Sequence, residues 1–355
     1  MKEKLVFAAL SIVLLSWPKT AAGQCSTYGG RATVVQANGL GITPVALSDT
    51  GNINSTGGIN DASLLGASVP GLLSGEVLSA TAGGRGSSTM SFASMANLKL
   101  TVAGNTIGAG FVMAKANAYC GTGVTGKAEI DGLMVNGLSV AVTGAPNQTV
   151  SLLGGGYMIL NEQTSNPTSG SITVNAIHVK VPAVSDVIIG SASAAISGQL
   201  TGASGGPHIF VGLLLQVTGG PGCSFFTGGG WIPPANPAPV GKGTFGVSGG
   251  MTPGGNVIGH LEYIDHGTGM NVHGTGVAPI VLCGSGGISQ LIGSADIKNG
   301  PSTCAGTFTV TVVDNDSSGG GPDYFSIVLD STDSSGPCYS ASGNLAGGDI
   351  EFHKD

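Results

Sequence analysis

The densest group of side chains that could do chemistry lies in the segment 259–273, GHLEYIDHGTGMNVH. Imidazoles and carboxylates are common ligands of zinc and related metals. On a strand, His260 and Glu262 project from the same face, and a turn at 265–266 would bring His273 back beside them. These three residues form a candidate metal site, although we favour a structural hairpin whose imidazoles and carboxylates bond the turn.

A second group of carboxylates occupies 314–319, where the sequence DNDSSG matches the first half of a calcium-binding loop. An EF-hand needs a bidentate Glu at the twelfth position, which is Phe325 here, and it needs flanking helices where this chain is strand-like. Asp323 could replace that Glu in a different geometry. Asp314, Asp316 and Asp323 are therefore a candidate calcium site, with a solvated hairpin tip as the favoured alternative.

Motifs of known enzyme classes carry little weight in this chain. The pattern G-x-S-x-G occurs at 202–206 and 246–250, but Gly and Ser are so frequent that chance accounts for both matches. The pattern G-x-G-x-x-G at 121–126 leads into another strand-like run, so no helix start is present to hold a pyrophosphate. Neighbouring carboxylates such as Glu129 and Asp131 keep a polysaccharide hydrolase or lyase as an alternative.

The composition indicates which kind of secondary structure contains these residues. Of the 355 residues, 64 are Gly, only 9% are charged and 5% are aromatic. Each Gly costs a helix about 1 kcal/mol, which disfavours a helical protein. The mean hydropathy of +0.33 disfavours disorder, and the net charge of −7 with few cations disfavours nucleic-acid binding.

Apolar and polar residues alternate with a period of two, as half-buried strands require. Clear examples are 97–102, 171–181 and 306–313. Between two such runs, Asn136-Gly137 predicts a type I′ hairpin turn. The pattern predicts an all-β protein made of two antiparallel β-sandwich or barrel-like domains, bonded by disulfides.

The first 23 residues predict a secretory signal peptide. Lys2 and Lys4 precede the apolar run 5–15, and the small residues 21–23 offer a cleavage site before Gln24. The apolar run is too short to cross a membrane, and no second long apolar run follows. We expect a secreted chain without a membrane span, released or associated with the cell surface.

The six Cys all lie outside this segment, and an even number of Cys in an exported chain predicts disulfides. Cys25 and Cys120 are the two Cys of the N-terminal half. Cys304 and Cys338 both open predicted strands separated by one hairpin partner, which places them at the same end of a sheet. The predicted pairs are Cys25–Cys120, Cys304–Cys338 and, by elimination, Cys223–Cys283.

A cluster of turn formers at 218–222, TGGPG, marks a domain boundary. We therefore predict a signal peptide over 1–23, one β domain over 24–217 and a second over 218–355. Two domains also agree with the length of the chain.

Several segments of the N-terminal half resemble the choice-of-anchor P family of bacterial exported proteins, over about residues 24–200. These segments are Ala32–Val35, Gly41–Pro44, Ala62–Leu65, Val69–Leu73, Ala96–Ile107, Gly144–Thr149, Ile159–Thr164 and Gly170–His178. The C-terminal half is similar to a β-module of bacterial exported proteins through 227–232, 241–246, 259–267 and 339–343. The resemblance implies an envelope or extracellular protein and brings no catalytic residues, and this chain shows no recognisable C-terminal anchor.

These features together predict a secreted or cell-surface bacterial β-protein with a structural, adhesive or surface-binding role and no catalysis. We expect no cofactor, apart from a candidate calcium ion. The expected partners are glycans or proteins of the cell envelope or the extracellular space, and not nucleic acid. Two alternatives stay open: a secreted polysaccharide hydrolase or lyase, and a calcium-dependent carbohydrate-binding module.

Overall fold

The computed structural model describes residues 25, 27–39, 43–166, 168–198, 223–233, 241–252, 255–284, 287–315, 320–332 and 336–354. Strands hold 74% of these residues, and no α-helix occurs among them. A single 3-10 turn, η1, spans Leu153–Gly155. The strand pairs are antiparallel. The all-β prediction is confirmed.

The described residues up to 198 form two sheets, which we call the outer and the middle sheet. The outer sheet has the order β10 (Gln148–Ser151), β11 (Tyr157–Asn166), β12 (Ser171–Val181), β13 (Ser185–Ser197), β1 (Thr27–Gly39) and β2 (Val45–Asp49). The middle sheet has the order β3 (Gly58–Val69), β4 (Leu73–Arg85), β5 (Ser88–Val102), β6 (Asn105–Tyr119), β8 (Met134–Val135) and β9 (Leu138–Ser139), and β7 (Gly123–Asp131) also pairs with β6.

The described residues from 223 onward form one nine-stranded sheet, the C-terminal sheet, which curls into a half-barrel. Its order is β21 (Tyr339–Asn344), β20 (Tyr324–Ser331), β19 (Cys304–Val313), β18 (Ile288–Lys298), β17 (Met270–Gly284), β16 (Val257–Asp265), β15 (Gly243–Met251), β14 (Cys223–Ile232) and β22 (Gly347–Lys354). Aromatic rings fill its hollow, with Phe245 stacked on Phe325 at 3.9 Å. The predicted domain boundary at 217–218 lies outside the described residues.

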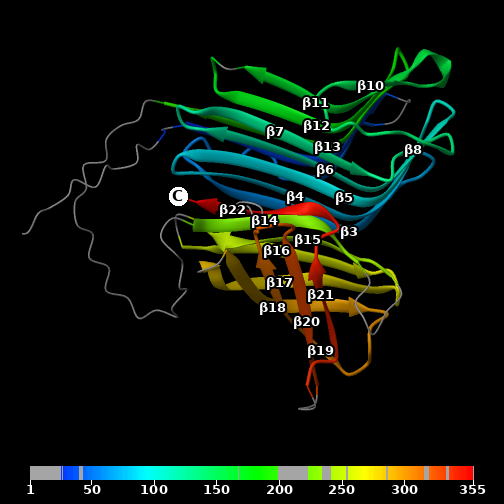
Figure 1. Ribbon diagram of the computed structural model, residues 1–355. Coiled ribbons are helices and arrows are strands. Elements are labelled where there is room, and N and C mark those ends of the chain that lie inside the picture. Colours follow the sequence, from blue (N-terminus) through cyan, green and yellow to red (C-terminus); the bar gives the residue numbers. More distant parts are fainter. Residues whose placement is uncertain are drawn as a thin grey trace, which may run out of the picture.

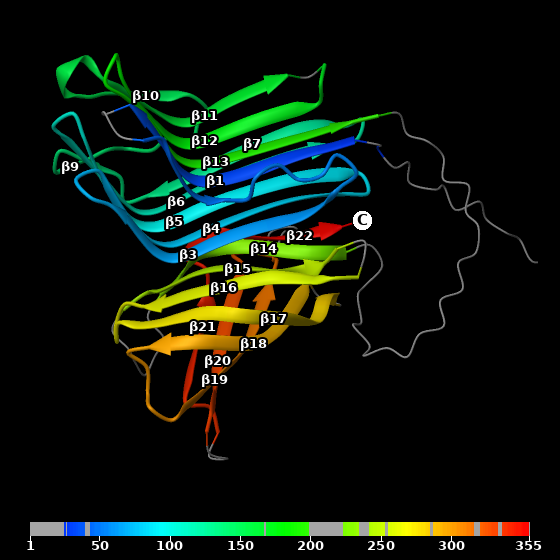
Figure 2. The same cartoon turned by 180° about the vertical axis from the view of Figure 1, so that it is seen from behind.

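The three sheets are stacked, with the middle sheet between the other two (Figures 1 and 2). The central strands β4, β5 and β6 are therefore buried on both faces. The β4 side chains that face the outer sheet, such as Leu78 and Ala80, are apolar, whereas those that face the C-terminal sheet, such as Ser79, are small and polar. Small residues let the layers approach closely: a Cβ on Gly83 would lie 2.3 Å from the Phe225 ring.

A row of interruptions in the strand pairing crosses the outer sheet. Cross-strand partners are missing at Gly190 and Asn161, which have positive φ angles of 66° and 49°. The buried face of β12 accordingly changes from the even-numbered residues up to Ala176 to the odd-numbered residues from Ile177 onward. The regular alternation of side chains thus shifts by one residue across this row.

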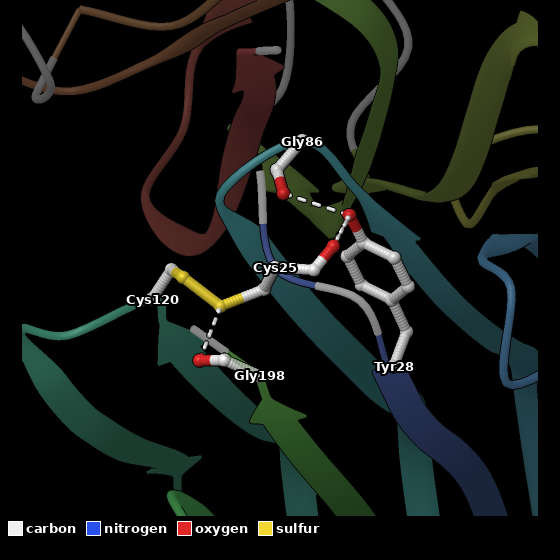
Figure 3. The surroundings of a disulfide bond; sticks show 5 residues. All are labelled: Cys25, Tyr28, Gly86, Cys120 and Gly198. Carbon is white, nitrogen blue, oxygen red and sulfur yellow. Dashed lines mark hydrogen bonds between the residues drawn. A yellow bond between two sulfur atoms is a disulfide. The ribbon is translucent and has the colours of Figure 1, made fainter. Parts of the chain in front are cut away.

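Two predicted disulfides are present, Cys25–Cys120 and Cys304–Cys338. The first ties the chain before β1 to the end of β6, which joins the outer and the middle sheet (Figure 3). Beside it, the Tyr28 hydroxyl lies 2.7 Å from the Gly86 carbonyl oxygen and 3.1 Å from that of Cys25. The side chains of Cys223 and Cys283 lie outside the described part, so their pairing stays a prediction.

Candidate functional site

The hairpin predicted over 259–273 is formed by β16 and β17, and Glu262 lies directly opposite His273. The Nδ1 atom of His273 is 2.8 Å from Glu262 Oε1, and the Ser63 hydroxyl donates to the same oxygen at 2.9 Å. Glu262 is fully buried. Burial raises the pKa of this carboxyl, although His273, Ser63 and His260 partly oppose the shift.

His260 lies on the same face as Glu262 but has other partners. Its Nε2 atom is 2.8 Å from the Ser79 hydroxyl, and its Nδ1 atom is 3.0 Å from the hydroxyl of Ser248 and 3.2 Å from Asp61 Oδ2. Burial acts to raise the pKa of Asp61, but its hydrogen bond to His260 and the charge there outweigh burial and lower it.

The three predicted metal ligands therefore lie at the seam between the middle and the C-terminal sheet. Glu262 and His273 meet as expected, whereas His260 bonds hydroxyls and a carboxylate from both halves of the chain. Within the residues that the structure describes, no group of three or more His, Cys, Asp and Glu is placed to hold a metal ion. The observed bonds are those of a polar, hydrogen-bonded interface.

The same seam contains a buried charge cluster that the sequence did not reveal. The Lys115 ammonium lies 2.6 Å from Asp349 Oδ2 and also pairs with Glu351. Burial acts to lower the pKa of Lys115, but the two carboxylates outweigh it and raise that pKa. Nearby, the His353 ring stacks on Phe225 at 3.5 Å, and burial holds its pKa well below the ordinary value.

The candidate calcium ligands Asp314 and Asp323 both bond the last strand, β22. Asp323 Oδ2 accepts the Ile350 N–H at 2.7 Å, and Asp314 Oδ2 accepts the Phe352 N–H at 3.1 Å. Both carboxylates are almost fully buried. Asp316, the third predicted ligand, lies outside the described residues.

A third carboxylate completes this pattern. Glu129 of β7 accepts the Gly348 N–H at 2.7 Å. Among the strands that the structure describes, β22 pairs with β14 alone and so forms an edge of the sheet. An open edge exposes alternate N–H groups that can pair with another strand. On this edge, the N–H groups of residues 348, 350 and 352 each donate to a carboxylate, so they are not open to another strand.

The exposed face of the outer sheet carries a further charged cluster, which the local sequence pattern does not predict. His178 lies between two carboxylates, with Nδ1 2.6 Å from Glu162 and Nε2 2.8 Å from Asp186. Both ring nitrogens can donate only when the imidazole is protonated. Burial acts to raise the pKa of Glu162, but Asn175 and His178 outweigh it and lower that pKa.

Comparisons with known proteins do not assign a family. No family model matches the chain, and no curated protein matches it. A crystal structure of a protein from Nitrosomonas europaea, provisionally described as AttH, aligns over 92% of both chains at 8% identity. Its TM-score is 0.17, and this likeness carries no argument about fold or function.

In the described part of the chain, no helix is long and apolar enough to cross a membrane. The predicted signal peptide over 1–23 lies outside that part.

Proposed function

We propose that this chain is an exported bacterial β-protein that acts outside the cell or on its surface as a structural, adhesive or surface-binding component, without catalysis. The resemblance to the choice-of-anchor P family, the sequence of residues 1–23 and the two disulfides support export. Disulfides persist mainly in oxidising compartments.

One observation carries the non-catalytic part of the proposal. Several acids and imidazoles of the seam bond groups of the protein itself: Glu262 Oε1 bonds Ser63 and His273, and Asp323 bonds backbone amides. A general acid or base must reach a substrate within hydrogen-bond distance. The partners of these groups belong to the protein, which supports a structural role for them.

The partners that fit this proposal are glycans or proteins of the cell envelope. The outer sheet presents a broad exposed face rich in hydroxyl and amide side chains, such as Thr164, Thr173 and Asn175. Its charges are of both signs, as in the neighbouring Lys180 and Asp186, so attraction of highly charged polymers such as nucleic acid is not favoured.

Export can be tested directly. The full chain is expressed in a Gram-negative host, the culture is fractionated, and the N-terminus of the recovered protein is determined by mass spectrometry. We expect protein outside the cytoplasm that begins at Gln24 and has its disulfides formed. Recovery only in the cytoplasm with residues 1–23 intact would contradict the proposal. A Leu10→Arg variant, which breaks the apolar run, is the matched control and should stay inside.

A further inference from the structure

A shallow pocket of about 480 Å³ opens on the outer sheet at the turn between β12 and β13. The turn is apolar and exposed, and Val184 is 44% exposed at the rim. The polar residues of the lining include Tyr157, Lys180, Asp186 and Asn38. The pocket therefore combines apolar surface with a small number of donors and acceptors, as small-molecule sites do.

These four polar residues form a straight row across four neighbouring strands. Tyr157 of β11 pairs with Lys180 of β12, Lys180 pairs with Asp186 of β13, and Asp186 pairs with Asn38 of β1. Directly paired residues project from the same face of a sheet. Three strand spacings give the row a length of roughly 14 Å, which suits an extended chain of several units better than a single small molecule.

The groups in this row are free to bind a ligand. The Tyr157 side chain is 36% exposed, and within the described residues neither its hydroxyl nor the Lys180 ammonium has a hydrogen-bond partner. Asp186 is 51% exposed; its Oδ1 atom is bonded to His178, so its orientation is fixed while Oδ2 stays available.

The charges around the pocket cancel. Lys180 and Asp186 are the charged residues of the lining and carry opposite charges, so the pocket offers donors and acceptors without a net charge. An anion such as a phosphate or a uronate polymer would need an excess of cations. A neutral polyhydroxylated ligand fits better, because its hydroxyls both donate and accept, and its C–H faces can pack on the Tyr157 ring.

We propose that the row Tyr157–Lys180–Asp186–Asn38 binds a neutral oligosaccharide along the exposed face of the outer sheet. The inference rests on the proposed surface-binding function and names its ligand class. The ring of Tyr157 packs against one sugar face, while Lys180, Asp186 and Asn38 bond successive hydroxyls. His178 is a positioning residue that holds Asp186.

The test uses the purified full chain on an array of neutral hexose oligosaccharides, with sialylated and uronate oligosaccharides as the charged arm. The strongest neutral hit is then titrated calorimetrically with wild type, Tyr157→Ala, Asn38→Ala and Tyr119→Ala. Tyr119 is the matched control, because it is a tyrosine of 37% exposure far from the pocket on β6. Thermal melts establish that each variant is folded.

We expect a neutral oligosaccharide to bind, Tyr157→Ala to weaken its binding about tenfold or more, Asn38→Ala to weaken it by a smaller factor, and Tyr119→Ala to leave it unchanged. Binding of charged glycans alone, no binding to any neutral glycan, or equal affinity of Tyr157→Ala and wild type would overturn the proposal. Release of reducing ends during the titration would instead contradict the non-catalytic function, so the two failures are distinguishable.

Discussion

Lys115 of the middle sheet contacts Asp349 of the C-terminal sheet at 2.6 Å, with side-chain exposures of only 13% and 2%. The two residues are 234 positions apart in the sequence. A buried ion pair of this kind joins the two halves of the protein, and removal of one partner leaves the other charge buried and unpaired.

Replacement of Lys115 by Met should therefore destabilise the protein by about 3–5 kcal/mol, since both Asp349 and Glu351 lose their cation. Urea unfolding followed by circular dichroism measures the loss. Lys127→Met is the matched control, because Lys127 is half exposed and its pair with Glu129 should contribute about 1 kcal/mol or less. Equal unfolding midpoints for the two variants would show that the buried pair does not stabilise the seam.

Replacement of Asp323 by Ala should weaken the edge of β22, because the N–H groups of Ile350 and Asn315 lose their acceptor. We expect a loss of about 2 kcal/mol or more and faster hydrogen exchange at Ile350. Asp330→Ala, which removes an exposed carboxylate bonded to Thr307, is the control. A calcium-dependent rise in the melting temperature of wild type, absent in the Asp323 variant, would assign Asp323 to a calcium site instead.

His353 should make the stability depend on pH. Burial, with a smaller effect of Lys115, holds its pKa well below 6.5, so the unfolded chain binds this proton more readily than the folded one. Above about pH 7 the imidazole is neutral in both states and does not change the free energy of unfolding. As the pH falls below 6.5, the free energy of unfolding decreases by at most about 1.4 kcal/mol per pH unit.

The raised pKa values of Glu262 and Glu351 act in the opposite direction, because a folded state with a raised carboxyl pKa gains stability as the pH falls toward 4.5. A comparison of wild type with His353→Phe removes their effect, since both proteins contain them. Denaturant titrations between pH 7.5 and 5.5 should show a smaller loss for the variant. Parallel pH profiles for wild type and the variant would mean that folding does not lower the pKa of His353.

The disulfides should stabilise the protein to different degrees. Cys25–Cys120 closes a sequence separation of 95 residues and Cys304–Cys338 one of 34. Each double Cys→Ser variant should lose about 2–5 kcal/mol, and the loop-entropy model gives about 1 kcal/mol more for the longer loop. Thermal melts of the two variants provide the comparison, and an unchanged wild-type melt in dithiothreitol would argue against both contributions.

Local features of the chain were predictable from the sequence. The strand predicted at 171–181 is β12, and the predicted turn residues Asn136 and Gly137 have positive φ angles of 50° and 80°. Glu262 and His273 were placed together because one hairpin positions both. In each case a period of two and a turn signal within a few residues contain the information.

The remaining features depend on long-range packing. Strict alternation along β12 places His178 with the buried Ile172 and Val174, and only the shift near Gly190 turns it to the exposed face beside Glu162. Nothing in the local sequence marks that shift. Likewise, the partners of Lys115 and Asp323 come from strands that meet only when the sheets stack.

The proposed lack of catalysis is tested most directly by incubation of the full chain with a panel of neutral and acidic polysaccharides and by measurement of new reducing ends and unsaturated uronates over time. If the buried acids and imidazoles are structural, product should not rise above that of a heat-inactivated sample. Product that increases with protein concentration and disappears in a Glu262→Gln variant that melts like wild type would contradict a non-catalytic role.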